Sequence, residues 1–189
     1  MKNNRHGQAT IFSNQDYEKI ISCTVGENHR MIFRVAYYTG ARMGEVVKLK
    51  TSDVYQESGK VLEVITYQAA STKTKETRQV PVNPKLKEFL QVYWQLQKPD
   101  HSGYLFPGMT KHLQFQSADD AFRRAIRCAG LDGLGFSTHS FRRTAATNLA
   151  NAGIGIPVIQ RFTGHRSLGN LQRYIDSSPV HVEKAVLCL

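Results

Sequence analysis

The chain has 189 residues, enough for one domain with a sizeable core and too few for two of ordinary size. Its 25 lysines and arginines exceed its 15 acidic residues, which gives a formal charge of +10, and 41% of its residues are apolar. This composition excludes an acidic or disordered chain. It predicts a folded domain whose surface attracts polyanions, of which nucleic acid is the commonest.

The distribution of apolar residues excludes two further classes. No stretch approaches the roughly 20 apolar residues of a membrane span, and the start, MKNNRHGQAT, lacks the apolar core of a secretory signal. We therefore expect a cytoplasmic protein with no membrane partner. Its cysteines, Cys23, Cys128 and Cys188, are odd in number and far apart, which predicts isolated thiols rather than a metal site or a disulfide framework.

Helical periodicity dominates the first part of the chain. One helix is expected from Ser13, a good N-cap, to Gly26, and a second from Asn28 to Gly40. A short third helix is expected after Arg42. Glycine at the end of a helical stretch is a common stop signal, so the two glycines set these boundaries.

A small antiparallel sheet is expected next. Segment 61–67 is rich in β-branched residues, and segment 77–82 alternates between apolar and polar residues. The polar connection between them, AASTKTKE, carries two lysines. The two segments are predicted to pair as a hairpin.

The remainder of the chain is predicted to be helical. Asn83 and Pro84 form a good cap and first turn for a helix with a long apolar stripe. Four further helices are expected from Ser117 to Gly130, over 140–152, from Pro157 to Gly164 and over 167–175. The sequence thus predicts a mainly α fold with a small antiparallel β-sheet, in one domain over 13–189, after a leader or linker remnant over 1–12.

Candidate functional residues are polar groups that the apolar pattern does not need. Arg42 lies in TGARMGEV between Gly40 and Gly44, where the backbone can approach a ligand closely. His139 and Arg142, in THSFRRT, are three residues apart at the start of a helix. They therefore share one face beside a helix N-terminus, which favours anions.

Three further candidates have ordinary structural alternatives. His165 follows Gly164 at a break between two helices, where a capping or surface histidine is common. Tyr174 lies at helical spacing from apolar residues, as a core tyrosine would. Lys73 lies in the polar connection of the hairpin, where a solvated lysine is expected.

The six candidates together form the set that phosphoryl transfer without a metal requires. Two guanidinium groups can neutralise the non-bridging oxygens of a phosphodiester and the added charge of its transition state. A tyrosine phenol, with an ordinary pKa of about 10, can be the nucleophile once a base takes its proton. Histidine and lysine can move protons. The sequence shows no paired carboxylates, Walker-type loop or metal-ligand spacing, so neither a metal nor a cofactor is expected.

The order of these motifs resembles the tyrosine recombinase family, also called the phage integrase family. The resemblance is carried by TGARMGEV, TKTKETRQVPV, THSFRRTAAT, TGHRS and NLQRY, and it extends from about residue 13 to the C-terminus. It implies the integrase-type catalytic fold of a DNA breaking-rejoining enzyme, with double-stranded DNA as the partner and the nucleoid as the place of action. Lys73, eight residues before Pro81, has the position of the family's hairpin lysine more closely than Lys75 does.

The resemblance implies a role for each residue that touches the phosphate. Tyr174 would attack a DNA phosphorus, form a 3′-phosphotyrosyl link and release a 5′-hydroxyl. Arg42 and Arg142 would hold the scissile phosphate, and His165 would give it a further hydrogen bond.

The resemblance also implies how protons move. His139 would accept the phenol proton or belong to that relay, and Lys73 would protonate the departing 5′-oxygen. Glu45, three residues after Arg42, matches an acidic position of the family and would orient a catalytic base, with an ordinary helix surface as the alternative. Because the ester bond energy is conserved, neither ATP nor a divalent metal would be needed.

Two features bear on the assembly. The family's N-terminal helical domain, which clamps the other face of the DNA, is expected to be absent, so the chain is either a catalytic fragment or a small stand-alone recombinase of the kind that inverts fimbrial promoters. The tail HVEKAVLCL has an apolar face that either packs on its own domain or passes to a neighbouring subunit, as in the family. We expect a monomer in solution and a homotetramer on paired DNA sites.

The sequence therefore predicts a site-specific DNA recombinase or integrase. One alternative is a non-catalytic DNA-binding regulator on the same fold, against which the intact set of six residues argues. Another is a type IB topoisomerase, which uses nearly the same residues; the short chain and the TGHRS motif favour a recombinase.

Overall fold

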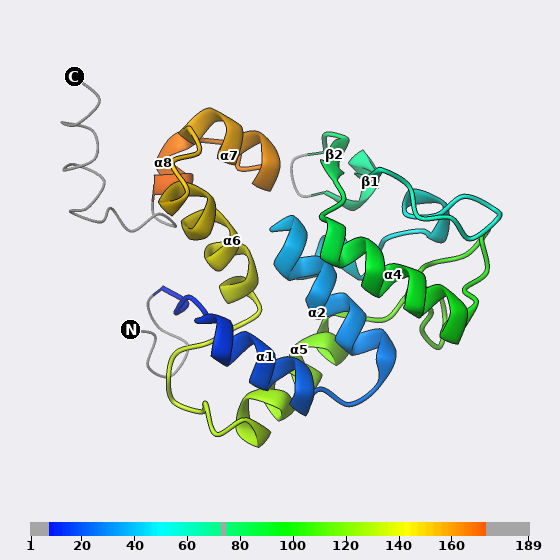
Figure 1. The fold of residues 1–189 in the computed structure, drawn as a ribbon, viewed down its shortest axis with the longest axis horizontal. Helices are drawn as coiled ribbons and strands as arrows, with labels where there is room; N and C mark the ends of the chain where they lie inside the picture. Colours follow the sequence, from blue (N-terminus) through cyan, green and yellow to red (C-terminus); the bar gives the residue numbers. More distant parts are fainter. Residues whose placement is uncertain (1–7, 73–74, 173–189) are drawn as a thin grey trace.

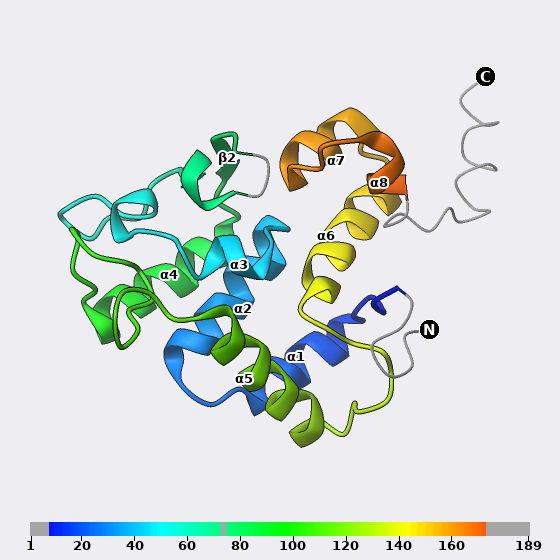
Figure 2. The same cartoon turned by 180° about the vertical axis from the view of Figure 1, so that it is seen from behind.

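The structure is a computed structural model that describes residues 8–72 and 75–172. Lys73, Tyr174, Cys188 and the apolar C-terminal tail lie outside the described residues. Figure 1 shows the arrangement of the described elements, and Figure 2 shows it from behind.

Helices make up most of the described chain, and the two strands form one antiparallel sheet. This confirms the predicted mainly α fold with a small antiparallel sheet. The elements in chain order, with η for 3₁₀-helices, are α1 (Asn14–Cys23), α2 (Glu27–Thr39), α3 (Met43–Val46), η1 (Thr51–Asp53), β1 (Val64–Tyr67), η2 (Ala69–Ser71), β2 (Arg78–Pro81), α4 (Pro84–Gln97), α5 (Phe115–Cys128), α6 (His139–Asn151), α7 (Ile156–Thr163) and α8 (Leu168–Gln172).

Helix α2 lies at the centre of the fold. It packs against α6 on one side and α4 on the other, while α1 and α5 pack together at one end of the molecule (Figures 1 and 2). Its side chains Met31, Ile32, Phe33 and Val35 are all buried. Helices α7 and α8 follow α6, and the end of α2 lies close to both α6 and α7 (Figure 1).

Side-chain caps begin two helices as the sequence predicts. The Ser13 hydroxyl accepts the backbone N–H of Asp16 at 3.1 Å, and the Asp16 carboxylate accepts the N–H of Ser13 in return, also at 3.1 Å. Before α4, the Asn83 side chain accepts the N–H of Lys85 at 2.9 Å, and Pro84 occupies the first turn. Both caps satisfy N–H groups that a helix leaves without partners.

Two predicted helix boundaries are wrong by a few residues. Helix α1 ends at Cys23 because the Thr24 hydroxyl donates to the carbonyl of Ile20 at 2.7 Å, and Gly26, at φ 85°, precedes α2 instead of ending α1. Helix α5 begins at Phe115 rather than Ser117. Neither difference changes which helices form.

The hairpin pairs Ile65 with Val80 and Tyr67 with Arg78. The side chains of Ile65 and Val80 are fully buried, which fixes the register because a slip by one residue would expose both. The first strand is shorter than predicted, since Val61 forms an isolated bridge with Tyr55 outside the sheet.

The segment before α1 packs on the domain. The Phe12 ring lies 4.9 Å from that of Phe141, and the N–H of Phe12 donates to the hydroxyl of Thr144 at 2.8 Å. The Arg143 guanidinium donates to the carbonyl of Ala9 at 2.6 Å. Residues 9–12, whose polarity suggested a leader, are therefore anchored to α6, while the domain boundary at residue 13 stays a prediction.

Two of the cysteines predicted to be isolated lie together. Cys23 and Cys128 end α1 and α5, and their Sγ atoms are 2.7 Å apart. This contact could not be predicted, because the two residues are 105 positions apart and meet only through the packing of the two helices. Among the described helices, none has the length and apolar character needed to cross a membrane.

Candidate active site

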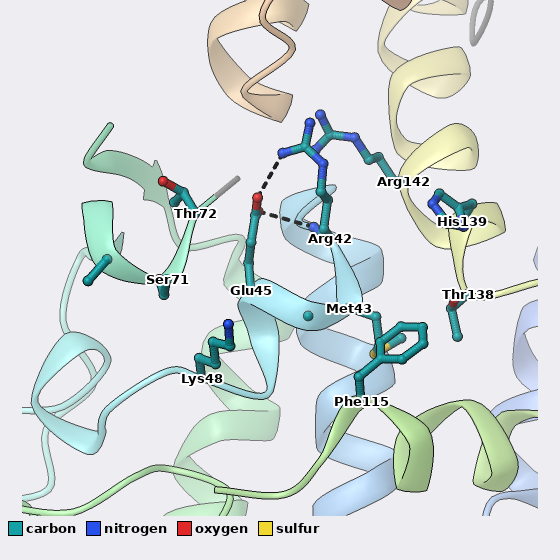
Figure 3. A pocket seen from close by; sticks show the side chains of 12 residues that line it. Arg42, Met43, Glu45, Lys48, Ser71, Thr72, Phe115, Thr138, His139 and Arg142 are labelled. Atoms are coloured by element: carbon teal, nitrogen blue, oxygen red, sulfur yellow. Dashed lines mark hydrogen bonds and ion pairs between the residues drawn. The ribbon is translucent and has the colours of Figure 1, made fainter. Parts of the chain in front are cut away.

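Four predicted site residues line one cavity of about 340 Å³: Arg42, Glu45, His139 and Arg142. The cavity lies where α3, η2 and the N-terminus of α6 meet (Figure 3). Residues separated by about 100 positions in the sequence therefore share one site.

A tight turn positions Arg42. Gly40 ends α2 in the left-handed conformation at φ 60°, and Arg42 then precedes the short helix α3. Glu45, in the first turn of α3, accepts the Arg42 guanidinium Nη1 at 2.7 Å and the Arg42 backbone N–H at 3.2 Å (Figure 3). Only 3% of the Glu45 side chain is exposed, against 28% for Arg42, so a buried carboxylate holds a guanidinium that reaches the cavity.

Backbone carbonyls position Arg142. This side chain is 2% exposed, and its Nη1 donates to the carbonyl of Gly40 at 2.9 Å and to that of Thr163. These two carbonyls belong to the ends of α2 and α7, so Arg142 joins both helix ends to α6. Figure 3 shows the guanidinium groups of Arg42 and Arg142 turned toward one another at the edge of the cavity.

His139 is the first residue of α6 and is exposed at the cavity. Its backbone N–H donates to the Ser137 hydroxyl at 3.3 Å. One helical turn separates it from Arg142, and both side chains line the same cavity, as their spacing predicts. The N-terminus of α6 adds a partial positive charge beside them.

His165 follows α7 and contacts Arg142. The Nε of Arg142 donates to Nε2 of His165 at 3.3 Å, and Nδ1 of His165 lies 2.7 Å from the Thr163 hydroxyl. That hydroxyl also donates to the carbonyl of Ile159 at 2.7 Å. An acceptor at Nε2 and a donor at Nδ1 satisfy every one of these bonds, so the pattern assigns the proton to Nδ1.

Burial lowers the pKa of His165 to about 3, with the nearby guanidiniums of Arg142, Arg42 and Arg78 acting in the same direction. Its imidazole is therefore neutral near pH 7. His165 does not line the cavity of Arg42 and His139. It lines a neighbouring cavity of about 520 Å³ between β2 and α7.

Two predicted site residues, Lys73 and Tyr174, lie outside the described residues, and their roles stay predictions. Thr72, directly before Lys73, lines the first cavity. Sequence reasoning missed Lys48, an exposed side chain at the same cavity. It also missed Arg78, which bonds to Glu45. Lys48 follows the motif TGARMGEV, and Arg78 lies within TKTKETRQVPV. Neither residue interrupts the apolar periodicity, so the sequence pattern does not mark either one as a candidate.

The arrangement suits an anion. Two guanidiniums, a lysine and a helix N-terminus converge on one open cavity, while the Glu45 carboxylate is occupied by arginines. Guanidinium forks match the oxygens of a phosphate in geometry and charge. Within the described ranges, no group of three or more His, Cys, Asp or Glu side chains lies close enough together to hold a metal ion.

Sequence comparison agrees with this reading. The model of the family described as "Phage integrase family" matches residues 11–181. A protein of Sinorhizobium fredii named as an integrase/recombinase is 29% identical over 170 residues, which cover 87% of this chain and 51% of that protein. The integrase of Escherichia phage 186 is 30% identical over 156 residues, covering 82% of this chain and 39% of the phage protein. The chain thus spans about half the length of the curated relatives it matches.

Solved structures share the fold. The catalytic domain of bacteriophage HP1 integrase has a TM-score of 0.68 and 25% identity, and the match covers 95% of this chain and 94% of that domain. XerA recombinase has a TM-score of 0.74 and 22% identity over 94% of this chain and 65% of its own. With a family match over most of its length and this fold, the chain belongs to the phage integrase family, the tyrosine recombinases.

Proposed function

We propose that this chain carries the catalytic machinery of a site-specific DNA recombinase or integrase, which cuts and rejoins double-stranded DNA through a 3′-phosphotyrosyl intermediate without metal or ATP. The observation that supports this most directly is the meeting of Arg42, His139 and Arg142 at one cavity beside the N-terminus of α6. The formal charge of +10 supports DNA as the partner.

The two arginines would bind the scissile phosphate. Arg42 and Arg142 approach the cavity from different elements, so their forks can take different non-bridging oxygens. Their charge would count most in the pentacoordinate transition state, which carries one more negative charge than the diester. Glu45 would keep Arg42 in place rather than touch the DNA.

The chemistry is a transesterification. Oη of Tyr174 attacks phosphorus as its proton passes to His139 or its relay, the bond between phosphorus and the 5′-oxygen breaks, and Lys73 gives that oxygen a proton. One phosphate ester replaces another, so no energy source is consumed. Attack by the 5′-hydroxyl of another strand reverses the steps and completes the exchange.

His165 would donate a hydrogen bond to the phosphate, which requires a proton on Nε2. In this structure Nε2 instead accepts from Nε of Arg142. When a phosphate draws the Arg142 fork toward itself, Nε2 becomes available to carry the proton. The Thr163 hydroxyl, 2.7 Å from Nδ1, would then donate to Nδ1 in place of the carbonyl of Ile159. DNA binding would then shift the imidazole from one neutral tautomer to the other.

The proposed assembly is a monomer in solution and a homotetramer on paired sites, joined through the C-terminal tail. The protein would act at the nucleoid in the cytoplasm. XerH recombinase, solved with its difH substrate, has a TM-score of 0.73 and 22% identity over 97% of this chain, which supports a DNA-bound arrangement on this fold.

Covalent capture on DNA tests the proposal. The protein is incubated with nicked suicide duplexes drawn from the DNA that flanks its coding region, and a protein–DNA adduct is sought on denaturing gels. We expect an adduct with the wild-type chain, none with Tyr174→Phe, and no loss of activity on adding EDTA.

The other outcomes separate the alternatives. An adduct with Tyr174→Phe contradicts the nucleophile assignment. Specific DNA binding without an adduct favours a regulator, and relaxation of a supercoiled plasmid without strand exchange favours a type IB topoisomerase.

A further inference from the structure

Arg78, the first residue of β2, lies at the junction of three elements. Its Nη2 donates to Oε2 of Glu45 in α3 at 3.2 Å, and its Nη1 donates to the carbonyl of Phe162 in α7 at 2.5 Å. Its guanidinium carbon lies 4.5 Å above the ring of Tyr67 in β1. Its side chain is 10% exposed, so these bonds are largely shielded from water.

One of these contacts completes the environment of Glu45. The Oε1 atom of this carboxylate accepts the Arg42 guanidinium, while Oε2 accepts the Arg42 backbone N–H and the Arg78 guanidinium. Without Arg78, one oxygen of a 3% exposed carboxylate would keep only a backbone donor at 3.2 Å. Such a carboxylate can rotate, and the Arg42 fork that it holds would rotate with it.

A second contact fixes the end of α7. The last carbonyls of a helix have no partner within the helix and carry partial negative charge, so cations are favoured there. Here two successive carbonyls are each taken by an arginine, that of Phe162 by Arg78 and that of Thr163 by Arg142. His165 comes two residues later, so these bonds define the turn that presents its ring.

The glycine of this turn shows how closely Arg78 approaches. Gly164 has φ 69°, and a Cβ placed on it would lie 2.9 Å from both Cδ and Nε of Arg78. No side chain fits between the Arg78 stem and the backbone of the turn. The hairpin and α7 are thus in direct contact at the edge of the site.

We infer that Arg78 is a positioning residue of the active site: it holds Glu45, and so Arg42, in register with the α7 turn that presents His165. This inference rests on the proposed function, since it assigns Arg78 a role in that same site. Arg78 itself does not line the cavity shared by Arg42 and Arg142. It bonds to Glu45, which holds Arg42, and to the end of α7, whose last carbonyl holds Arg142. Arg78 thus connects α3, the hairpin and α7 through its own contacts.

Three variants of the full chain test this. Arg78→Met removes the charge and both hydrogen bonds but keeps an unbranched side chain over Tyr67. Arg78→Lys keeps the charge without the fork. Arg124→Met, at an exposed arginine of α5, is the matched control for loss of one positive charge. Thermal unfolding by circular dichroism establishes that each variant is folded.

Cleavage and binding are then measured separately on the suicide duplex. We expect Arg78→Met to lower the single-turnover rate at saturating DNA by about tenfold or more, while the dissociation constant changes by less than about threefold because many other phosphate contacts remain. Arg78→Lys should recover part of the rate, and Arg124→Met should match wild type. A folded Arg78→Met or Arg78→Lys that cleaves at the wild-type rate overturns the inference.

A double variant tests the route of action. If Arg78 acts through Glu45, then Arg78→Met combined with Glu45→Gln lowers the rate little further than the more severe single variant. Losses that multiply would show that the two residues act independently and would overturn the coupling through Glu45.

A readout without DNA separates this inference from the proposed function. Nitrogen-15 shifts at neutral pH report which ring nitrogen of His165 carries the proton. We expect the Nδ1 form in wild type and Arg124→Met, and mixed tautomers in Arg78→Met because the turn is no longer fixed. If wild type forms no adduct, the proposed function fails, and this measurement alone decides on Arg78: an unchanged tautomer in Arg78→Met overturns it.

Discussion

The two arginines of the site are held by partners of different charge. Arg42 bonds to the Glu45 carboxylate, which offsets part of its charge, whereas Arg142 bonds to the carbonyls of Gly40 and Thr163, which are neutral. At the scale of single residues, Arg42 is held by an ion pair beside the cavity, whereas Arg142, only 2% exposed, is held by hydrogen bonds to the ends of α2 and α7.

Glu45→Gln tests how much the carboxylate contributes. The amide can still accept one hydrogen bond, but it leaves two guanidiniums close together without a counter-charge. We expect a loss of about 1 to 3 kcal/mol in the free energy of unfolding and a cleavage rate about tenfold lower. Chemical denaturation measures the first quantity and suicide-duplex cleavage the second.

Glu63→Gln is the matched control. Its carboxylate also pairs with a cation, Lys87 at 2.6 Å, but 79% of the side chain is exposed. Water replaces such a pair easily, so neither stability nor cleavage should change measurably. Equal effects of the two substitutions would show that the burial of Glu45 is irrelevant to its role.

Individual site residues could be predicted where a short motif carries them. His139 and Arg142 are three apart on one helix, and their common face follows from the helical repeat. Arg78 could not be predicted in this way, because its partners Glu45 and Phe162 lie 33 and 84 positions away in the sequence. Only the folded chain brings a strand residue against the end of a distant helix.

At the scale of elements, the end of α2 determines how closely the supporting helices meet. Gly40 has a left-handed φ of 60°, and a Cβ there would lie 3.3 Å from Cβ of Ala145 in α6 and 3.3 Å from a ring carbon of Phe162 in α7. Any side chain at this position would push α6 or α7 away. The carbonyl of Gly40 that accepts from Arg142 would move with them.

Gly40→Ala should therefore cost more than backbone strain alone. Gly153→Ala is the control, since Gly153 has φ 78° but nothing lies within 4 Å of an added Cβ. We expect Gly153→Ala to destabilise by about 1 kcal/mol from the left-handed conformation, and Gly40→Ala by about 1 to 3 kcal/mol more from crowding. Denaturant unfolding checks both values, and equal losses would contradict the crowding argument.

The contact between α1 and α5 predicts a disulfide. The Cys23 and Cys128 thiols are 2.7 Å apart, and Cys128 is exposed. Two thiols and one glutathione disulfide should give the Cys23–Cys128 disulfide and two reduced glutathiones. Because the bond closes a loop across 105 positions, we expect the free energy of unfolding to rise by about 2 to 4 kcal/mol.

Mass spectrometry after oxidation checks for this bond. The mass of the oxidised protein should be lower by two hydrogens, and its digest should contain a cross-linked peptide pair. The midpoint of thermal unfolding should rise, and a reductant should reverse the rise. Cys23→Ser should show neither change. Glutathione attached to Cys128 in the wild-type chain, without the cross-link, would show that the two thiols are not held in reach.

Element boundaries could be predicted where a capping residue determines them, as Gly40 and Gly164 do at the ends of α2 and α7. Ser13 and Asn83 supply oxygens that cap their helices, and both boundaries are as predicted. Gly26 permits either a helix end or a helix start, and the Thr24 hydroxyl decides between them by bonding to α1. The local sequence pattern alone therefore could not predict whether Gly26 ends α1 or precedes α2.

At the scale of the whole molecule, the site lies between two parts of the fold. Arg42 and Glu45 come from the part built on α2, α3 and the hairpin, while Arg142 and His165 come from α6 and α7 (Figures 1 and 3). The bonds of Arg142 to Gly40 and of Arg78 to Phe162 cross between them. The sequence order of the motifs indicated the family and hence this topology, whereas composition and periodicity alone could not fix which helices pack together.

The excess positive charge of the whole chain predicts how DNA binding responds to salt. Each phosphate neutralised releases counterions, so the logarithm of the binding constant should fall linearly with the logarithm of salt concentration. For about six contacts, affinity should fall roughly a thousandfold between 50 and 200 mM salt. Arg161 and Arg166 are exposed at the cavity between β2 and α7, and replacing either by Gln should lower the slope by about one unit.

Fluorescence anisotropy across a salt series measures these slopes. Lys60→Gln, at an exposed lysine that does not line this cavity, removes the same charge and should leave the slope at its wild-type value. If all three substitutions lowered the slope equally, DNA would be held by net charge without a preferred face. If only the two arginine substitutions lowered the slope, the duplex must run past α7. The DNA backbone would then lie over the groups that surround His165.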